Sequence, residues 1–262
     1  MNSGRALANA GAPCPEASAA PRRHVDMKRL RSSKSRNWLL AKLPDSTRRH
    51  IVEQCDAIEL RVGDTLSTVG QPLRHVYFPT SGFASLVAAL DAGAQVDVGV
   101  VGSEGMVGIP LVLGAPWALQ TATVRCSGTD WKMPAAEFRR ELLHSDVLRE
   151  RLNLYVYVCM AQLSQTAACT RYHTVEARLA RWLLLARDRL HSDSFTLTHE
   201  LLAYMLGVRR AGVTGAANSL RERGLIRYAR GSIDLVDCSG LEEAACECYG
   251  RANESYRRVL GR

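Results

Sequence analysis

The stretch from Ala135 to Leu206 contains neither proline nor glycine, the two residues that most often interrupt regular structure. All nine prolines lie at or before Pro134, and 12 of the 20 glycines precede it. The lack of these residues excludes a turn-rich architecture for the middle of the chain. It predicts short strands and turns before Pro134 and long helices after it.

Long apolar runs are also absent. No segment approaches the roughly 20 apolar residues that a membrane-spanning helix needs, and residues 1–36 hold no apolar run of the signal-peptide type. The eight cysteines are scattered among long helical patterns, unlike the disulfide frameworks of small secreted domains. We therefore expect a cytoplasmic protein with no membrane partner.

The sequence also lacks a recognisable set of catalytic residues. The candidates Asp97, Glu104, His75 and His173 do not follow any spacing of nucleophile, base and orienting group. We expect them to be turn, cap or surface residues. The sequence does not predict an enzyme.

Positive charge is in excess, and most of it lies near the N-terminus. Residues 1–36 carry eight Lys/Arg against two acids, which is +6 of the net charge of +8. Their Pro-, Ala- and Ser-rich composition predicts a disordered basic leader. In residues 197–231, six arginines against two glutamates give a second excess of +4. A local excess of this kind is typical of phosphate-binding surfaces.

Five apolar segments separated by turn residues precede Ala135: RHVYFP, SGFASLVAAL, AQVDVGVVG, ATVRCSG and TDWKMP. Short strands at this regular spacing are typical of a small antiparallel barrel or sandwich. A short helical segment, Trp38 to Gln54, is expected before them.

A short helix, AAEFRRELL, follows Pro134, and Ser145 or Asp146 can cap a longer helix that runs toward Arg171 or beyond. The long helix has one apolar face at heptad spacing from residue 148 to 173. A second apolar face consists of Val156, Met160, Leu163 and Ala167. Two faces favour a helix that packs on the barrel and on a second copy of the chain. The alternative is one long core helix in a monomer.

Residues 197–226, LTHELLAYMLGVRRAGVTGAANSLRERGLI, carry the most informative pattern. The first helix has an apolar stripe of Leu201, Leu202, Met205 and Leu206, and Gly207 supplies the left-handed conformation that ends it. The second helix has one buried face, formed by Val213, Ala216, Ala217 and Leu220. This is a helix-turn-helix, whose second helix can lie in a DNA major groove. IRYARGSIDLVD then predicts the hairpin of a winged helix, and GLEEAACECYGRANESYRRVL predicts a C-terminal helix.

In this order of elements, and in the motif TxxxLAxxLGVxRxxVTxxxxxLxxxGLI, the chain resembles the Crp/Fnr family of bacterial transcription regulators over residues 37–240. The implied fold is α+β, with an N-terminal antiparallel β-barrel like that of cyclic-nucleotide-binding domains. The expected parts are a basic leader (1–36), a barrel sensor domain (37–144), a long dimerisation helix (145–173), a winged helix-turn-helix domain (174–240) and a C-terminal helix (241–262). The resemblance implies a homodimer in which a signal in the barrel reorients two DNA-binding heads.

The segment EGMVGIPLVLG…QTATVRCSG resembles the family's phosphate-binding cassette in placement. Members that bind cyclic nucleotides carry a glutamate for the ribose and an arginine, followed by Ser or Thr, for the phosphate. Here the aligned positions are Met106, Gln120 and Thr121, and a glutamine supplies no charge-assisted contact. Cyclic AMP is therefore not expected as the effector, and no cofactor is expected. The candidate effector pocket consists of Gly105, Met106, Gly108, Gln120, Thr121, Arg125 and Ser164.

The predicted recognition helix offers few base-reading side chains. Arg210 suits a guanine, Asn218 suits an adenine, and Thr214 suits a thymine methyl group or a phosphate. Arginines at the end of this helix and in the wing suit phosphates. The candidate DNA-binding residues are Arg209, Arg210, Thr214, Asn218, Arg221, Arg223 and Arg230. Double-stranded DNA, a second copy of the chain and RNA polymerase are the expected partners. The alternative is a small-molecule sensor or protein-interaction module with degenerate DNA binding.

No metal site is expected. The oxygen-sensing branch of the family uses an N-terminal cysteine cluster for an iron–sulfur centre, but the leader has only Cys14, and Cys55 is distant from it. Cys246 and Cys248 fall in the predicted C-terminal helix, where positions i and i+2 project about 200° apart. Packing cysteines are thus favoured over a redox or metal site.

Overall fold

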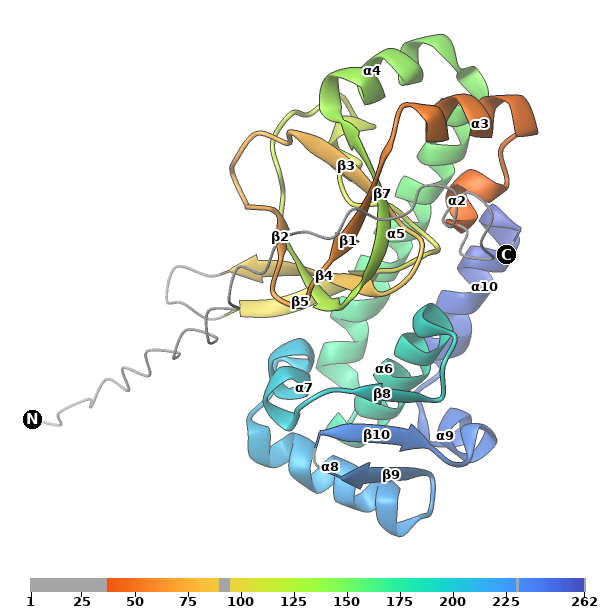
Figure 1. Cartoon of the computed structure of the whole chain (residues 1–262). Coiled ribbons are helices and arrows are strands. Elements are labelled where there is room, and N and C mark those ends of the chain that lie inside the picture. Colours follow the sequence, from red (N-terminus) through yellow and green to blue (C-terminus); the bar gives the residue numbers. More distant parts are fainter. Residues whose placement is uncertain (1–36, 90–94, 230, 262) are drawn as a thin grey trace, which may run out of the picture.

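The computed structural model describes residues 37–89, 95–229 and 231–261, so the predicted leader, residues 1–36, lies outside the described residues. Figure 1 shows the strand-rich part at one end, the small helices around α8 at the other, and the long helix α5 running between them. Among the described helices, none is long and apolar enough to cross a membrane.

The strands before Ala135 form two antiparallel sheets. One has the order β1-β7-β3, with the bounds β1 Asp56–Leu60, β7 Gly128–Pro134 and β3 His75–Pro79. The other has the order β2-β6-β4-β5, with the bounds β2 Thr65–Ser67, β6 Thr121–Cys126, β4 Phe83–Ala89 and β5 Gln95–Val101. The predicted antiparallel class is confirmed, and the five predicted segments are β3 to β7. The short, polar strands β1 and β2 were not predicted.

Each sheet has a buried face. Tyr77 of β3, Ala84 of β4 and Ala122 of β6 belong to one apolar cluster, which therefore lies between the two sheets. Val76 and Phe78, on the other face of β3, pack with Phe138 and Leu152 from the helices. Because alternate residues of a strand point to opposite faces, β3 joins the inner core of the sheets to the core under the helices.

The helices that cover the sheets are α2 Trp38–Ala41, α3 Asp45–Glu53, α4 Ala135–His144 and α5 Asp146–Tyr172. Pro44 separates α2 from α3. The Ser145 side chain accepts a hydrogen bond from the Leu148 N–H (3.2 Å), so the predicted cap of the long helix is confirmed. The short 3₁₀ helix η1, Ile109–Leu111, follows the turn after β5.

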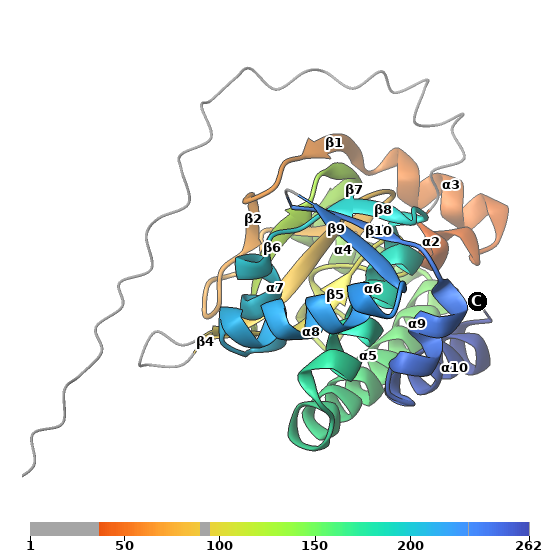
Figure 2. The same ribbon diagram turned by 90° about the horizontal axis from the view of Figure 1, so that it is seen from below.

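The C-terminal half contains the predicted winged helix. Its helices are α6 Val175–Leu190, α7 His199–Leu206 and α8 Arg210–Glu222. A small antiparallel sheet of order β8-β10-β9 packs beside them, with β8 Ser194–Thr196, β9 Ile226–Ala229 and β10 Ser232–Leu235. In the view of Figure 2, α8 lies in front of the rest of the chain, at the end away from the short helix α4.

The predicted single C-terminal helix is wrong. It is two helices, α9 Cys238–Ala244 and α10 Cys248–Leu260, with Ala245 in an extended conformation between them. α10 turns back and packs along α5, where Tyr256 and Leu260 enter the core under the sheets. The gain of this buried contact stabilises the break, although the sequence carries no proline or glycine there.

Candidate nucleic-acid interface and effector pocket

The helix-turn-helix is held by local features of its sequence. The Thr198 side chain accepts a hydrogen bond from the Leu201 N–H (3.2 Å) and caps α7, and Gly207 ends it at φ 61°. The predicted stripe of α8 is confirmed, because Val213, Ala216, Ala217 and Leu220 are all buried. These side chains belong to one core with α6, α7 and the wing sheet. Because this core holds the apolar face of α8, the opposite face of the helix is turned toward solvent.

The outward face of α8 and its N-terminal end carry exposed polar groups. The exposed candidates are Arg209, Arg210, Asn218, Arg221 and Arg223. Gly212 and Gly215 lie on the same exposed side, and a Cβ placed on either would meet no heavy atom within 4 Å. The backbone of α8 is therefore accessible to close approach by a large flat partner.

Thr214 and Arg223 already have partners inside the chain. The Thr214 hydroxyl lies 3.1 Å from Nδ1 of His199 and 3.1 Å from the Arg210 carbonyl oxygen. The His199 ring stacks on Tyr228 of β9 at 4.3 Å, so Thr214 connects α8 to the wing. Arg223 forms an ion pair of 2.8 Å with Glu176 of α6. Arg230, the predicted wing contact, lies outside the described residues.

The charge environment around His199 is positive. Burial and the charge of Arg210 lower the pKa of His199 below its ordinary value. A neutral His199 accepts or donates at Nδ1 without repelling the guanidinium groups at the start of α8. This histidine therefore acts as a neutral part of the packing between α7, α8 and the wing.

Only part of the predicted effector pocket comes together. Met106, Gly108 and Gln120 line a small cavity of about 30 Å³ that is bounded by β2, β4, η1 and the segment before β6. Among the described residues that line this cavity, none is charged. The Met106 side chain is fully buried and belongs to the core.

The other predicted pocket residues have different surroundings. The Thr121 hydroxyl accepts a hydrogen bond from the Val69 N–H (3.2 Å), and Arg125 lies over the ring of Tyr204 in α7 (4.9 Å). Ser164 is exposed on α5 and donates to the Met160 carbonyl oxygen (3.1 Å). Gly105 lies against Tyr155, whose hydroxyl would be 2.0 Å from a Cβ at this position. Arg125, Ser164 and Gly105 thus serve contacts to helices and do not line the small cavity.

A buried ion pair, which was not predicted from the sequence, joins the two halves of the chain. Glu104, in the turn after β5, lies 3.0 Å from Nε of Arg189 in α6, and the side chains are 0% and 4% exposed. Glu104 is a turn residue, as expected, but its side chain is buried. Asp97 is buried within strand β5, so the expectation that it is a turn, cap or surface residue is wrong. The glycines on either side of Glu104, at 102 and 105, are the signal that could have indicated a tightly packed turn, because neither has room for a Cβ.

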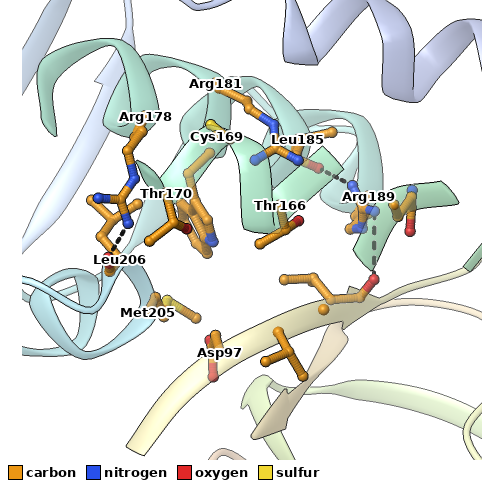
Figure 3. A pocket seen from close by; sticks show the side chains of 15 residues that line it. Asp97, Thr166, Cys169, Thr170, Arg178, Arg181, Leu185, Arg189, Met205 and Leu206 are labelled. Carbon is orange, nitrogen blue, oxygen red and sulfur yellow. Dashed lines mark hydrogen bonds between the residues drawn. The ribbon is translucent and has the colours of Figure 1, made fainter. Parts of the chain in front are cut away.

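A second junction between the two halves is a cavity of about 80 Å³ bounded by β5, α5, α6 and α7 (Figure 3). Asp97 projects from β5 on one side, and Arg178 and Arg181 project from α6 on the other. The Ser85 hydroxyl donates to Asp97 (2.7 Å), and burial raises the pKa of Asp97 to about 6. The sheet that contains β5 and the helices α6 and α7 therefore present both polar and apolar groups to this cavity.

A family model, the Crp-like helix-turn-helix domain, matches residues 177–244, which run from α6 to the end of α9. The overall fold is similar to FixK2 from Bradyrhizobium japonicum, with a TM-score of 0.65 and 14% identity over 73% of this chain and 98% of that one. The chain has the Crp/Fnr fold.

Other solved structures agree with this assignment. A transcriptional regulator of the Crp/Fnr family from Eubacterium rectale has a TM-score of 0.62 and 17% identity, over 79% of this chain and 96% of that one. The c-di-GMP-responsive global regulator CLP from Xanthomonas campestris has a TM-score of 0.59 and 15% identity, over 73% of this chain and 99% of that one. No curated protein sequence matches the chain. The resemblance expected from the sequence is confirmed for the fold and for the helix-turn-helix domain.

Proposed function

We propose that this protein is a sequence-specific transcription regulator of the Crp/Fnr type, that it acts as a homodimer, and that its signal is not cyclic AMP. The observation that carries the proposal is the exposed, arginine-flanked face of α8 on a Crp-like helix-turn-helix domain. A helix held in this way can enter the major groove, while nearby arginines neutralise phosphates.

The base-reading role falls on Arg210 and Asn218. Both are exposed, and Arg210 is the first residue of α8, near the N-terminal end from which recognition helices contact bases. A guanidinium reads guanine through two hydrogen bonds, and a carboxamide reads adenine in the same way. Arg223 contacts a DNA phosphate in this proposal. It forms an ion pair with Glu176 in the free protein, and a phosphate can replace this carboxylate as the partner of the guanidinium group.

The proposal of a signal other than cyclic AMP is supported by the cavity at the family's nucleotide position. Ligand pockets typically enclose about 300–1,000 Å³. The cavity here is about 30 Å³, and the Met106 side chain fills the space beside it. A cyclic nucleotide would have to displace core side chains without gaining a charged partner for its phosphate.

Dimerisation through α5 is supported by its outer surface. Four large apolar side chains on α5, Leu154, Tyr157, Met160 and Leu163, are 42–63% exposed. Successive members are three residues apart, so they form an exposed stripe that winds around α5 by about 60° per step, while Leu148, Leu152 and Tyr155 of the same helix are buried within the chain. Such a stripe is stabilised when it packs on the same stripe of a second copy.

The DNA proposal is tested by selecting bound genomic fragments and then measuring affinity by gel shift. We expect Arg210→Ala to weaken binding to selected fragments by about 1–3 kcal/mol and to relax specificity, while Arg223→Ala weakens all sequences alike. Arg139→Ala, which removes one exposed charge from α4, is the matched control and should change nothing. If no fragment is retained at moderate salt, the chain is instead a sensor or interaction module.

The proposal about the signal is tested by calorimetric titration of the full chain with cyclic AMP and cyclic GMP. We expect no micromolar binding of either mononucleotide, because the cavity beside Met106 is small and has an uncharged lining. Cyclic di-GMP is the third titrant, since CLP, which shares the fold, responds to it. Micromolar affinity for cyclic AMP would contradict the proposal.

A further inference from the structure

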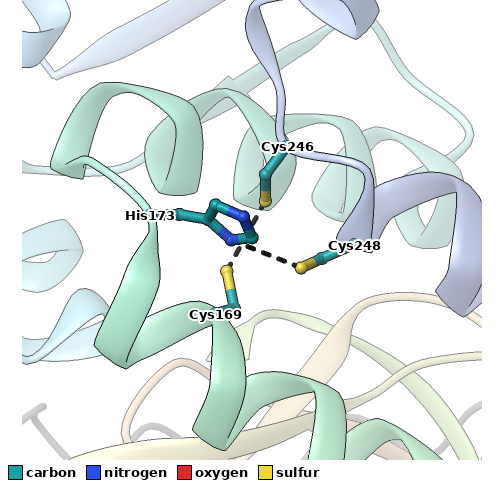
Figure 4. A group of neighbouring side chains, drawn as sticks. All are labelled: Cys169, His173, Cys246 and Cys248. Carbon is teal, nitrogen blue, oxygen red and sulfur yellow. Dashed lines mark hydrogen bonds between the residues drawn. The ribbon is translucent and has the colours of Figure 1, made fainter.

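Three cysteines and one histidine converge at the junction of α5 with the last two helices (Figure 4). The residues are Cys169, His173, Cys246 and Cys248, and the ligand atoms that they offer all lie within 4.8 Å of one another. Cys169, Cys246 and Cys248 are buried, and His173 is half-buried. None of these residues has a role in the proposed DNA or effector contacts.

The local structure explains how the four side chains meet. Cys169 and His173 are four residues apart at the end of α5, so both project from the same side of its last turn. Cys246 lies in the break between α9 and α10, and Cys248 begins α10. The premise that Cys246 and Cys248 diverge on one helix is therefore wrong. The break turns both sulfurs toward α5.

The distances suit four ligands around one small ion. Sγ of Cys169 lies 3.5 Å from Sγ of Cys246, and Sγ of Cys248 lies 3.5 Å from Nδ1 of His173. In a tetrahedral zinc site with Zn–S near 2.3 Å and Zn–N near 2.0–2.1 Å, neighbouring ligand atoms are separated by about 3.5–3.8 Å. These two distances match the lower end of that range, and every other pair of ligand atoms lies within 4.8 Å.

The surroundings of the four residues match those of ligands to a metal ion. Nδ1 of His173 faces the sulfurs, and its Nε2 lies 3.3 Å from the Glu247 carboxylate. A carboxylate on the second ring nitrogen is the usual partner that orients a metal-binding histidine. Gln165 donates a hydrogen bond to Sγ of Cys248 (2.9 Å).

Positive charge lies beside the cluster. The guanidinium groups of Arg178 and Arg181, both on α6, interact electrostatically with Cys169. Three thiolates with one divalent ion carry a net charge of −1, which these arginines offset.

We propose that Cys169, His173, Cys246 and Cys248 bind one zinc ion in a closed tetrahedral site that ties the end of α5 to the connection between α9 and α10. Three thiolates and an imidazole are soft and borderline donors, which select zinc over magnesium or calcium. Four protein ligands in a buried position leave no open place for water or substrate, as in structural zinc sites. The proposal is independent of DNA binding and of the effector.

The test begins with the metal content of the full-length chain, purified without chelator. We expect one zinc ion per chain by elemental mass spectrometry. After removal of zinc, titration with Co²⁺ should give the strong visible bands of tetrahedral cobalt with thiolate-to-metal charge transfer. Zinc binding should also protect three thiols from modification, identified by mass spectrometry as Cys169, Cys246 and Cys248.

Variants assign the ligands. Cys169→Ser and Cys248→Ser should lose zinc, whereas Cys238→Ser, a matched control on α9 outside the cluster, should retain it. His173→Cys should still bind Co²⁺ with a shifted charge-transfer spectrum, which keeps the test decisive if a serine variant fails to fold. The proposal is overturned if the folded chain takes up no Co²⁺ after reduction, or if the His173→Cys and wild-type spectra are identical. A Cys169–Cys246 disulfide that persists under mild reduction would also overturn it.

Discussion

Asp130 shows how a buried carboxylate makes the stability of the N-terminal sheets depend on pH. It lies in the middle strand β7 of its sheet, is 3% exposed, and its Oδ2 has no hydrogen-bond partner among the described residues. Burial raises the pKa of Asp130 to about 8. In the unfolded chain this carboxyl has an ordinary pKa near 3.8. The folded state therefore holds a proton that the unfolded state releases.

We expect Asp130→Asn to stabilise the protein, increasingly so as pH rises. Between about pH 4 and about pH 8 the wild-type free energy of unfolding falls with rising pH, because only the folded state keeps the proton, and it levels off above the folded pKa. The neutral amide removes the part of this slope that Asp130 causes, for a gain on the order of several kcal/mol at the upper end. Asp97, whose pKa is also raised, still contributes a slope between about pH 4 and about pH 6. Denaturant unfolding at a series of pH values measures it.

The control for this measurement is Asp56→Asn, on the neighbouring strand β1, where the side chain is exposed. Its unfolding curve should keep the wild-type dependence on pH. Equal pH slopes for wild type and Asp130→Asn would show that Asp130 is solvated or paired in solution.

At the scale of one element, α8 combines weak helix propensity with an accessible backbone. Gly212 and Gly215 lie in its first two turns, and no atom of the described residues occupies the space of a Cβ at either position. Each glycine lowers helix stability by about 0.5–1 kcal/mol relative to alanine. Their presence is unfavourable for the free protein, which points to close approach of a partner on that side.

We expect Gly212→Ala and Gly215→Ala to raise the thermal stability of the free protein slightly and to weaken DNA binding. The gain in helix propensity, about 0.5–1 kcal/mol each, acts in both states, while the added methyl groups separate α8 from the groove only in the complex. Thermal unfolding and gel shifts on selected fragments measure the two effects. Stronger DNA binding in the alanine variants would contradict a close backbone approach.

Gly105, which is packed inside the protein, serves as the comparison for the two exposed glycines of α8. Gly105→Ala places a methyl group against the Tyr155 hydroxyl, so it should lower the thermal stability of the free protein. We thus expect alanine to lower the thermal stability at position 105 and to raise it slightly at position 212. This difference would show that Gly105 is needed for packing inside the protein, whereas Gly212 is not.

The sequence predicted most elements but not the break near Cys246. Helical spacing located α7 and α8, and Gly207 marked the end of α7, because those features are local. Ala245, Cys246 and Glu247 are ordinary residues for a helix, and the break depends on the contact between α10 and α5. Long-range packing of this kind leaves no local signal.

The residues of the predicted effector pocket likewise could not all be placed from the sequence. An aligned motif placed Gly105, Met106 and Arg125 in one pocket. Backbone alignment cannot tell which way a side chain points, so the stacking of Arg125 on Tyr204 was not predictable. The fit of Gly105 against Tyr155, 50 residues away in sequence, was not predictable either.

At the scale of the whole molecule, the outer stripe of α5 determines the oligomeric state in our proposal. We expect Met160→Glu to convert the dimer to a monomer, because two like charges would face each other across a symmetric interface. Light scattering after size-exclusion chromatography measures the mass. Loss of the dimer should also weaken DNA binding, since one head then binds without the linkage to its partner.

The control for this variant is Leu143→Glu, which places the same charge on an apolar residue of α4 that is 78% exposed. It should remain a dimer. A wild-type chain that is monomeric at all accessible concentrations would leave the exposed stripe of α5 without the role proposed for it.

The contact of α7 with β5 has a consequence for any rotation of the DNA-binding head. β5 is an edge strand of its sheet, and α7 packs on it, with Val96 against Gly207 and Gln95 bonded to the Tyr204 hydroxyl. An uncovered edge with several valines is a template for pairing with other chains. A head that swings away from β5 must therefore exchange this cover for another surface, or the activated protein will aggregate.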